Sequence, residues 1–117
     1  KIFHVNWFRT DANGNYIWPG FGDNMRVLDW IIRRCDGEVD AVETPVGLMP
    51  KKEDINIDGM DAFNDVKLEE VLDLDISAWK KEAESISEFF DKFGDELPEK
   101  LAKQLRILKH NLRNENK

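Results

Sequence analysis

The stretch that separates strand-like from helical sequence is Trp18–Asn24, which reads WPGFGDN. Its proline cannot donate to a strand ladder and its two glycines permit backbone conformations closed to other residues, so extended structure must end here. Apolar residues then recur at helical spacing as far as Cys35, and Gly37 is typical of a helix end. We therefore expect a helix that begins at this turn, with Asp23 or Asn24 capping it.

Strand-like sequence lies on the N-terminal side of this turn. Residues 2–8 read IFHVNWF, with large apolar side chains at odd and even positions, which is typical of a strand covered on both faces. Asn13 and Gly14 form a strong turn signal, and residues 16–18 return as a short second strand. The pattern predicts an N-terminal β-hairpin.

The segment that follows the predicted helix is acidic and broken by prolines and glycines. Residues 38–75 therefore read as an acidic connector, with a short strand around residues 46–49 and a short helix over residues 66–72. Ile55 and Ile57 are expected to anchor this connector.

Two amphipathic helices are predicted in the remaining segment, residues 76–117. The first begins after a cap at Ser77, and the second follows Pro98, a residue suited to a first helical turn. Their short link favours antiparallel packing. The predicted fold class is α+β, a single segment 1–117 that combines a hairpin and helix (1–37), the connector and this helical pair.

The balance of charge excludes several classes of partner. The 117 residues carry a formal net charge of -7, and residues 36–75 hold thirteen acidic and three basic groups. Nucleic acids and anionic membranes require clustered Lys and Arg, so we expect neither as a partner.

No apolar run approaches the roughly 18 residues of a membrane span. The single cysteine, Cys35, cannot form an internal disulfide, which favours a reducing compartment, and we expect the cytoplasm.

Aromatic crowding is the strongest functional signal. Most aromatics near the N-terminus are expected in a core, Phe3, Trp18 and Trp30 above all. Phe21 differs because Gly20 and Gly22 leave little bulk beside it, so its ring is a natural stacking platform for a heterocyclic base.

A site that binds one particular base also needs a polar side chain that forms hydrogen bonds with the edge of that base. Asn24 follows Phe21 by one helical turn and offers both a donor and an acceptor to the edge of a stacked base. The competing interpretation of Asn24 is a plain helix cap, and the residues alone favour that interpretation.

Other possible sites are weaker. Residues 54–65 approach an EF-hand calcium loop, but Asp65 stands where a bidentate Glu belongs and prolines prevent the incoming helix. His4, His110 and Cys35 have no partners at metal or triad spacing. We predict no metal site and no catalytic residue in the chain, and its turn lacks the Gly-Lys-Ser/Thr ending of a phosphate loop.

Several motifs together resemble the C-terminal region of GTP-dependent phosphoenolpyruvate carboxykinases. The likeness covers essentially the whole chain. Two positions depart from the usual family pattern, with Tyr16 in place of phenylalanine and Asp23 in place of glutamate. The motifs are Phe3–Phe8 (FHVNWF), Asn13-Gly14, Trp18–Asn24, Arg26–Trp30 (RVLDW), Thr44–Pro50 (TPVGLMP) and Trp79.

The resemblance implies a guanine pocket. In this family three aromatics hold the base, which on this sequence are Phe8, Tyr16 and Phe21, and Asn24 helps to recognise its edge. Gly22 and Asp23 complete the same loop. The resemblance thus reverses the preference for Asn24 as a plain cap.

The resemblance also implies an activity for a longer parent protein. That enzyme converts oxaloacetate and GTP to phosphoenolpyruvate, GDP and carbon dioxide in gluconeogenesis, using Mn²⁺ and Mg²⁺ whose ligands lie outside this chain. Its expected partners are a guanine nucleotide and the rest of the parent enzyme, and this piece alone is expected to be inactive. The alternative is a non-catalytic helical module that binds another protein.

Overall fold

A computed structural model describes residues 1–115 of the chain, which form short strands and helices in two compact units. The first unit contains Lys1–Val42 and Leu48–Asp73, and the second contains Glu43–Gly47 and the chain from Leu74 onward. The combination of a two-stranded sheet with helices confirms the α+β fold class. Residues 116 and 117, the end of the predicted helical pair, lie outside the described residues.

The N-terminal hairpin is a chain reversal closed by a single antiparallel bridge between Thr10 and Tyr16. The amide of Ile17 donates to the carbonyl of Arg9 at 2.9 Å, and the carboxylate of Asp11 accepts from two amides within the turn. Regular strand pairing does not extend into residues 2–8, contrary to expectation. A two-stranded ribbon is marginal by itself, and no further strand pairs with these residues in the part of the chain that the structure describes.

The turn after Trp18 forms a short 3-10 helix, η1 (Phe21–Asp23), that runs directly into α1 (Asn24–Cys35). The predicted helix and its end at Gly37 are confirmed. Gly37 has a φ of 77°, and two backbone bonds, from Gly37 to Arg34 and from Glu38 to Arg33, close the end as a Schellman motif. The predicted side-chain cap is absent, because Asp23 occupies the cap position without such a bond.

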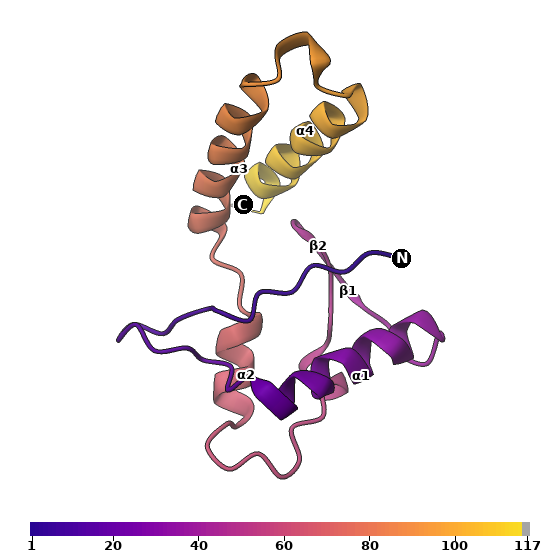
Figure 1. Cartoon of the computed structure of the whole chain (residues 1–117), viewed down its shortest axis with the longest axis vertical. Coiled ribbons are helices and arrows are strands. Elements are labelled where there is room, and N and C mark those ends of the chain that lie inside the picture. The colour runs from indigo at the N-terminus through magenta and orange to yellow at the C-terminus, as the bar shows by residue number, and fades with distance from the viewer. Residues whose placement is uncertain (116–117) are drawn as a thin grey trace. The chain divides into compact units, whose positions relative to one another are not determined.

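The regular sheet of the molecule lies in the acidic segment. Strands β1 (Val42–Thr44) and β2 (Gly47–Met49) pair across a two-residue connection, as Figure 1 shows. So short a link can join only antiparallel strands. The hydroxyl of Thr44 donates to the carbonyl of Gly47 at 2.5 Å and reinforces the turn. The short strand predicted around residues 46–49 is confirmed as β2, whereas β1 was not expected.

A hydrophobic core lies between the N-terminal region and the acidic segment of the first unit. Trp18 packs edge to face against Phe63, with ring centroids 5.0 Å apart. The predicted anchoring by Ile55 and Ile57 is confirmed, since the first is buried in this cluster and the second packs against it. The buried members of the core are Ile17, Trp18, Trp30, Ile55, Phe63 and Leu68.

Helix α2 (Asp65–Leu72) supplies part of this core through Leu68. Its first turn is capped by the side chain of Asn64, which accepts from the amide of Lys67. Ahead of it, η2 (Lys52–Asp54) is tied to α2 by an ion pair between Lys52 and Glu69. The hydrogen bond from Lys52 to Glu69, together with the charge of that carboxylate, raises the pKa of Lys52.

The second unit is built on α3 (Ile76–Asp91) and α4 (Glu99–Asn114), which are joined through η3 (Gly94–Glu96) and run side by side in opposite directions (Figure 1). An ion pair between Glu84 and Lys109 links the two helices. The cap of α3 is Asp75, which accepts from the amide of Ala78 at 2.9 Å, and not the expected Ser77.

None of the helices within residues 1–115 has the length and apolar character needed to cross a membrane.

Candidate functional site

Phe21 combines backbone strain with exposure. Gly20 and Phe21 have φ values of 80° and 51°, and Phe21 is the non-glycine residue with positive φ among residues 1–115. A bulky side chain is a genuine outlier in this region, and such strain costs about 1–3 kcal/mol. The ring is 95% exposed, so packing within the chain does not compensate for this cost. Strain that internal packing does not explain is typical of a binding site.

Phe8 and Tyr16 form a second aromatic surface on the N-terminal hairpin. Their ring centroids lie 5.7 Å apart with an interplanar angle of 60°, and the two residues are 67% and 66% exposed. Tyr16 itself forms the bridge to Thr10, which follows Phe8 by two residues, and this bridge holds the two sides of the reversal together. Phe21 does not pair with another ring among the described residues, so the structure brings two of the three predicted aromatics into contact.

Arg9 anchors this hairpin to the first unit. Its guanidinium donates to the carbonyls of Val71, at 3.2 Å, and Asp73, at the end of α2. Because Arg9 follows Phe8 directly, these bonds restrict the position of the aromatic pair relative to the core.

Asn24 is the first residue of α1, and its side chain does not cap the helix. Its carbonyl oxygen Oδ1 accepts a hydrogen bond from the indole Nε1 of Trp18 at 2.8 Å. The interpretation of Asn24 as a plain cap is therefore wrong, and its side chain is instead held on the same turn that carries Phe21.

Gly22 and Asp23 complete the turn. A Cβ atom added at Gly22 would meet no atom of the described residues other than its chain neighbours within 4 Å, so this position borders open space. Asp23 forms an ion pair with Arg26 at 2.9 Å, and Arg26 also donates to the carbonyl of Asn56 at 2.9 Å. The acidic residue thus helps to attach the turn to the core-forming segment.

One contact of the candidate site was not predicted from the sequence. Trp18 was expected only as a core residue, which its burial confirms, but its hydrogen bond to Asn24 makes it part of the candidate site as well. The sequence signal that could have revealed this bond is a tryptophan, whose indole can only donate, close to the asparagine at which the turn ends.

Phe3, also expected in the core, is 38% exposed and contacts the ring of Trp30 edge to face. Ile2, which precedes it, is 98% exposed and does not cover it.

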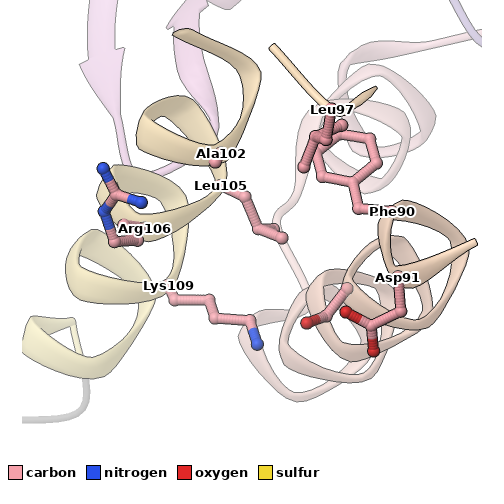
Figure 2. A pocket seen from close by; sticks show the side chains of 8 residues that line it. Phe90, Asp91, Leu97, Ala102, Leu105, Arg106 and Lys109 are labelled. Atoms are coloured by element: carbon pink, nitrogen blue, oxygen red, sulfur yellow. The ribbon is translucent and has the colours of Figure 1, made fainter. Parts of the chain in front are cut away.

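A hollow of about 230 Å³ lies in the helical pair. Figure 2 shows Leu105 and Lys109 extending from α4 toward α3, while Phe90 lies next to Leu97 at the other side. Apolar and charged groups alternate around it, and no group of three His, Cys, Asp or Glu side chains that could hold a metal ion occurs within residues 1–115. None of the candidate base-site residues lies there.

Comparison with known proteins identifies the family. A sequence model described as "Phosphoenolpyruvate carboxykinase C-terminal P-loop domain" matches residues 1–111. The chain belongs to the GTP-dependent phosphoenolpyruvate carboxykinase family. The match contains every candidate residue from Phe8 to Asn24.

Individual carboxykinases agree with this assignment. "Phosphoenolpyruvate carboxykinase [GTP]" of Renibacterium salmoninarum is 51% identical over 112 residues, which are 96% of this chain, and the protein of the same name from Treponema pallidum is 50% identical over 109 residues, or 92%. The Chlamydia caviae protein is 40% identical over 114 residues, or 97%. The chain spans 18–19% of the length of these carboxykinases.

Proposed function

We propose that this chain is the C-terminal part of a GTP-dependent phosphoenolpyruvate carboxykinase and supplies its guanine-binding pocket. The observation that carries the proposal is the exposed, strained ring of Phe21 on the same turn as Asn24. Family membership supports a guanine nucleotide as the ligand, because the matching relatives are named for GTP.

The aromatic side chains would hold the base by stacking. Each base that stacks on an aromatic face gains roughly 1–3 kcal/mol, and this gain is similar for all bases. Phe21 offers a face that touches little of its own chain, and the pair Phe8 and Tyr16 offers a second surface. Gly22, the residue that follows Phe21, borders open space. A bound base would cover apolar surface that the chain itself leaves in water.

Asn24 would supply the discrimination that stacking lacks. Guanine presents an oxygen at position 6 of the purine ring, whereas adenine presents an amino group there. A side-chain amide close to the stacking platform can distinguish these two groups by hydrogen bonding. Asp23 contributes indirectly, since its ion pair with Arg26 holds the turn in place.

The reaction itself would require residues outside this chain. We propose that the complete enzyme converts oxaloacetate and GTP to phosphoenolpyruvate, GDP and carbon dioxide in gluconeogenesis, and that the Mn²⁺ and Mg²⁺ ligands lie in the rest of the protein. Phosphoryl transfer needs metal ions and a cradle for the phosphates, and the chain carries no Gly-Lys-Ser/Thr sequence. The chain alone is therefore expected to be inactive. A cytoplasmic location, in keeping with the free Cys35, is part of this proposal.

Nucleotide selectivity tests the proposal. In the full-length protein, isothermal titration calorimetry should show that GDP and IDP bind with similar affinity and that ADP binds more weakly, because only the first two share the oxygen at position 6. Equal affinities for GDP and ADP would contradict a guanine-reading pocket. GDP is the suitable probe because it cannot be turned over in the absence of the other substrates.

The rival function is a helical module that binds another protein. Its support is the exposed aromatic pair formed by Phe89 on α3 and Phe93 just after α3, whose rings lie 5.3 Å apart in edge-to-face contact. An open reading frame that carries a Gly-rich phosphate loop upstream of Lys1 would favour the enzyme, and a start codon just before Lys1 would favour the module.

A further inference from the structure

The hydrogen bond between Trp18 and Asn24 fixes the direction in which the Asn24 amide points. An indole Nε1 can only donate, so the group that faces it at 2.8 Å must be the amide oxygen and not the amide nitrogen. Trp18 cannot move away easily, because it is 94% buried and packs against Phe63 in the core. The core therefore sets the rotamer of a side chain at the edge of the candidate site.

The opposite end of the amide remains available. Among residues 1–115, the Nδ2 group of Asn24 has no hydrogen-bond partner within the chain, and Asn24 is only partly buried. An NH₂ group can donate but cannot accept. Trp18 takes one of the two lone pairs of Oδ1 and holds that oxygen toward the buried indole, so the end of the amide that points away from the indole carries donors.

We propose that Trp18 is a positioning residue that makes the base site selective for purines with an oxygen at position 6. This inference rests on the proposed guanine pocket. The NH₂ end of the amide pairs with the position-6 oxygen of guanine or hypoxanthine, whereas it meets the position-6 amino group of adenine donor to donor. If Trp18 did not hold Oδ1, a half-turn of the amide would present that oxygen to adenine and remove the discrimination.

The core offers a matched control for this role. Trp30 belongs to the same buried cluster as Trp18, but its indole Nε1 is buried without a hydrogen-bond partner. Removal of the indole N–H from Trp30 therefore perturbs the same core without altering the hydrogen bonding of Asn24.

The experiment replaces each tryptophan, in the full-length protein, by 3-benzothienylalanine, in which sulfur takes the place of the indole N–H with little change of shape. The readout is the ratio of dissociation constants for ADP and GDP. Loss of one hydrogen-bond constraint should lower this ratio roughly tenfold at position 18, mainly through tighter ADP binding. The same replacement at position 30 should leave the ratio unchanged. Trp18→Phe and Trp30→Phe provide the same comparison with natural residues, provided that both variants fold.

The outcomes separate the two proposals when Asn24→Ala is measured alongside. If replacement of Trp18 lowers the ratio of the ADP and GDP dissociation constants, and Asn24→Ala lowers it as well, the result supports both the guanine pocket and the positioning role of Trp18. An unchanged ratio at position 18, with Asn24→Ala still reducing it, overturns the role of Trp18 and leaves the guanine pocket standing. Unchanged ratios in all variants overturn the guanine pocket itself. An equal fall at positions 18 and 30 assigns the effect to core packing and also overturns the positioning role.

Discussion

At the scale of one residue, Phe21 adopts a conformation that is unfavourable in the free chain, and we propose that nucleotide binding is the reason for it. Its positive φ costs conformational energy, and its exposed ring returns none of that energy through packing in the free chain. A glycine in its place would adopt the same backbone without strain. The sequence predicted the exposure from the flanking Gly20 and Gly22, but the strain at Phe21 itself became visible only in the structure.

Truncation of this ring should weaken nucleotide binding. We expect Phe21→Ala in the full-length protein to raise the dissociation constant of GDP by the loss of one stacking contact, about 1–3 kcal/mol or roughly 5–150-fold. Calorimetric titration measures the change. Phe89→Ala, which removes an exposed ring from α3, is the control and should leave GDP affinity unchanged. Wild-type affinity in Phe21→Ala would contradict the role of the ring.

Relief of the strain should separate stability from binding. Phe21→Gly is expected to raise the free energy of unfolding by about 1 kcal/mol, because glycine tolerates the positive φ, while GDP binding falls as far as in Phe21→Ala. Urea denaturation monitored by tryptophan fluorescence checks the first expectation. A glycine variant less stable than the alanine variant would mean that this φ is not strained.

Replacement of Asn24 should reduce the discrimination between GDP and ADP more than it changes the relative affinities of purines that carry an oxygen at position 6. We expect Asn24→Ala to reduce the preference for GDP over ADP by about 1–3 kcal/mol, the value of one directed base contact, and to change the preference for GDP over IDP less. The reason is that guanine and hypoxanthine share the oxygen at position 6. Equal loss of both preferences, measured by competition titration, would exclude Asn24 as the reader of that oxygen.

At the scale of elements, capping positions were harder to predict than the helices. The apolar spacing correctly indicated α1, α3 and α4, since it reports which face of a helix is buried, and the short helix expected over residues 66–72 is present as α2. The expected caps at the start of α1 and at Ser77 were wrong. Several capping-type residues lie near each helix start, and the geometry of the incoming chain decides which of them bonds to the backbone.

The cap of α3 offers a direct test. Asp75→Ala should lower stability by about 1 kcal/mol, because it removes the acceptor for the amide of Ala78, whereas Ser77→Ala should have little effect. Hydrogen exchange of amides in the first turn of α3 localises the change in the full-length protein. A larger loss of protection in Ser77→Ala than in Asp75→Ala would restore Ser77 as the cap.

At the scale of the whole molecule, the two compact units have separate sets of buried residues. The cluster that contains Trp18 and Leu68 belongs to the first unit, as do the candidate site residues, while Ala83 and Leu112 are buried in the second. Stability and nucleotide binding should therefore respond differently to damage in the two units.

Paired core truncations test this separation. Leu68→Ala and Leu112→Ala each remove a side chain that is almost fully buried and should each cost about 2–5 kcal/mol. Only Leu68→Ala should also weaken GDP binding, because its core holds Trp18 and the turn that follows. Thermal unfolding and GDP titration of both variants provide the measurements. Equal weakening of GDP binding would show that the second unit also supports the site.

The amino-acid sequence alone determined the helices, the position of the Gly-flanked turn and the family resemblance, because these depend on local spacing and on motifs of neighbouring residues. Tertiary structure decided that Phe63 covers Trp18 and that Asn24 turns away from capping toward the indole. It also decided that residues 2–8 do not pair as a strand. The first two outcomes depend on the burial of Trp18 by a distant segment, and local hydrogen-bonding and hydrophobic patterns do not encode which segment that is.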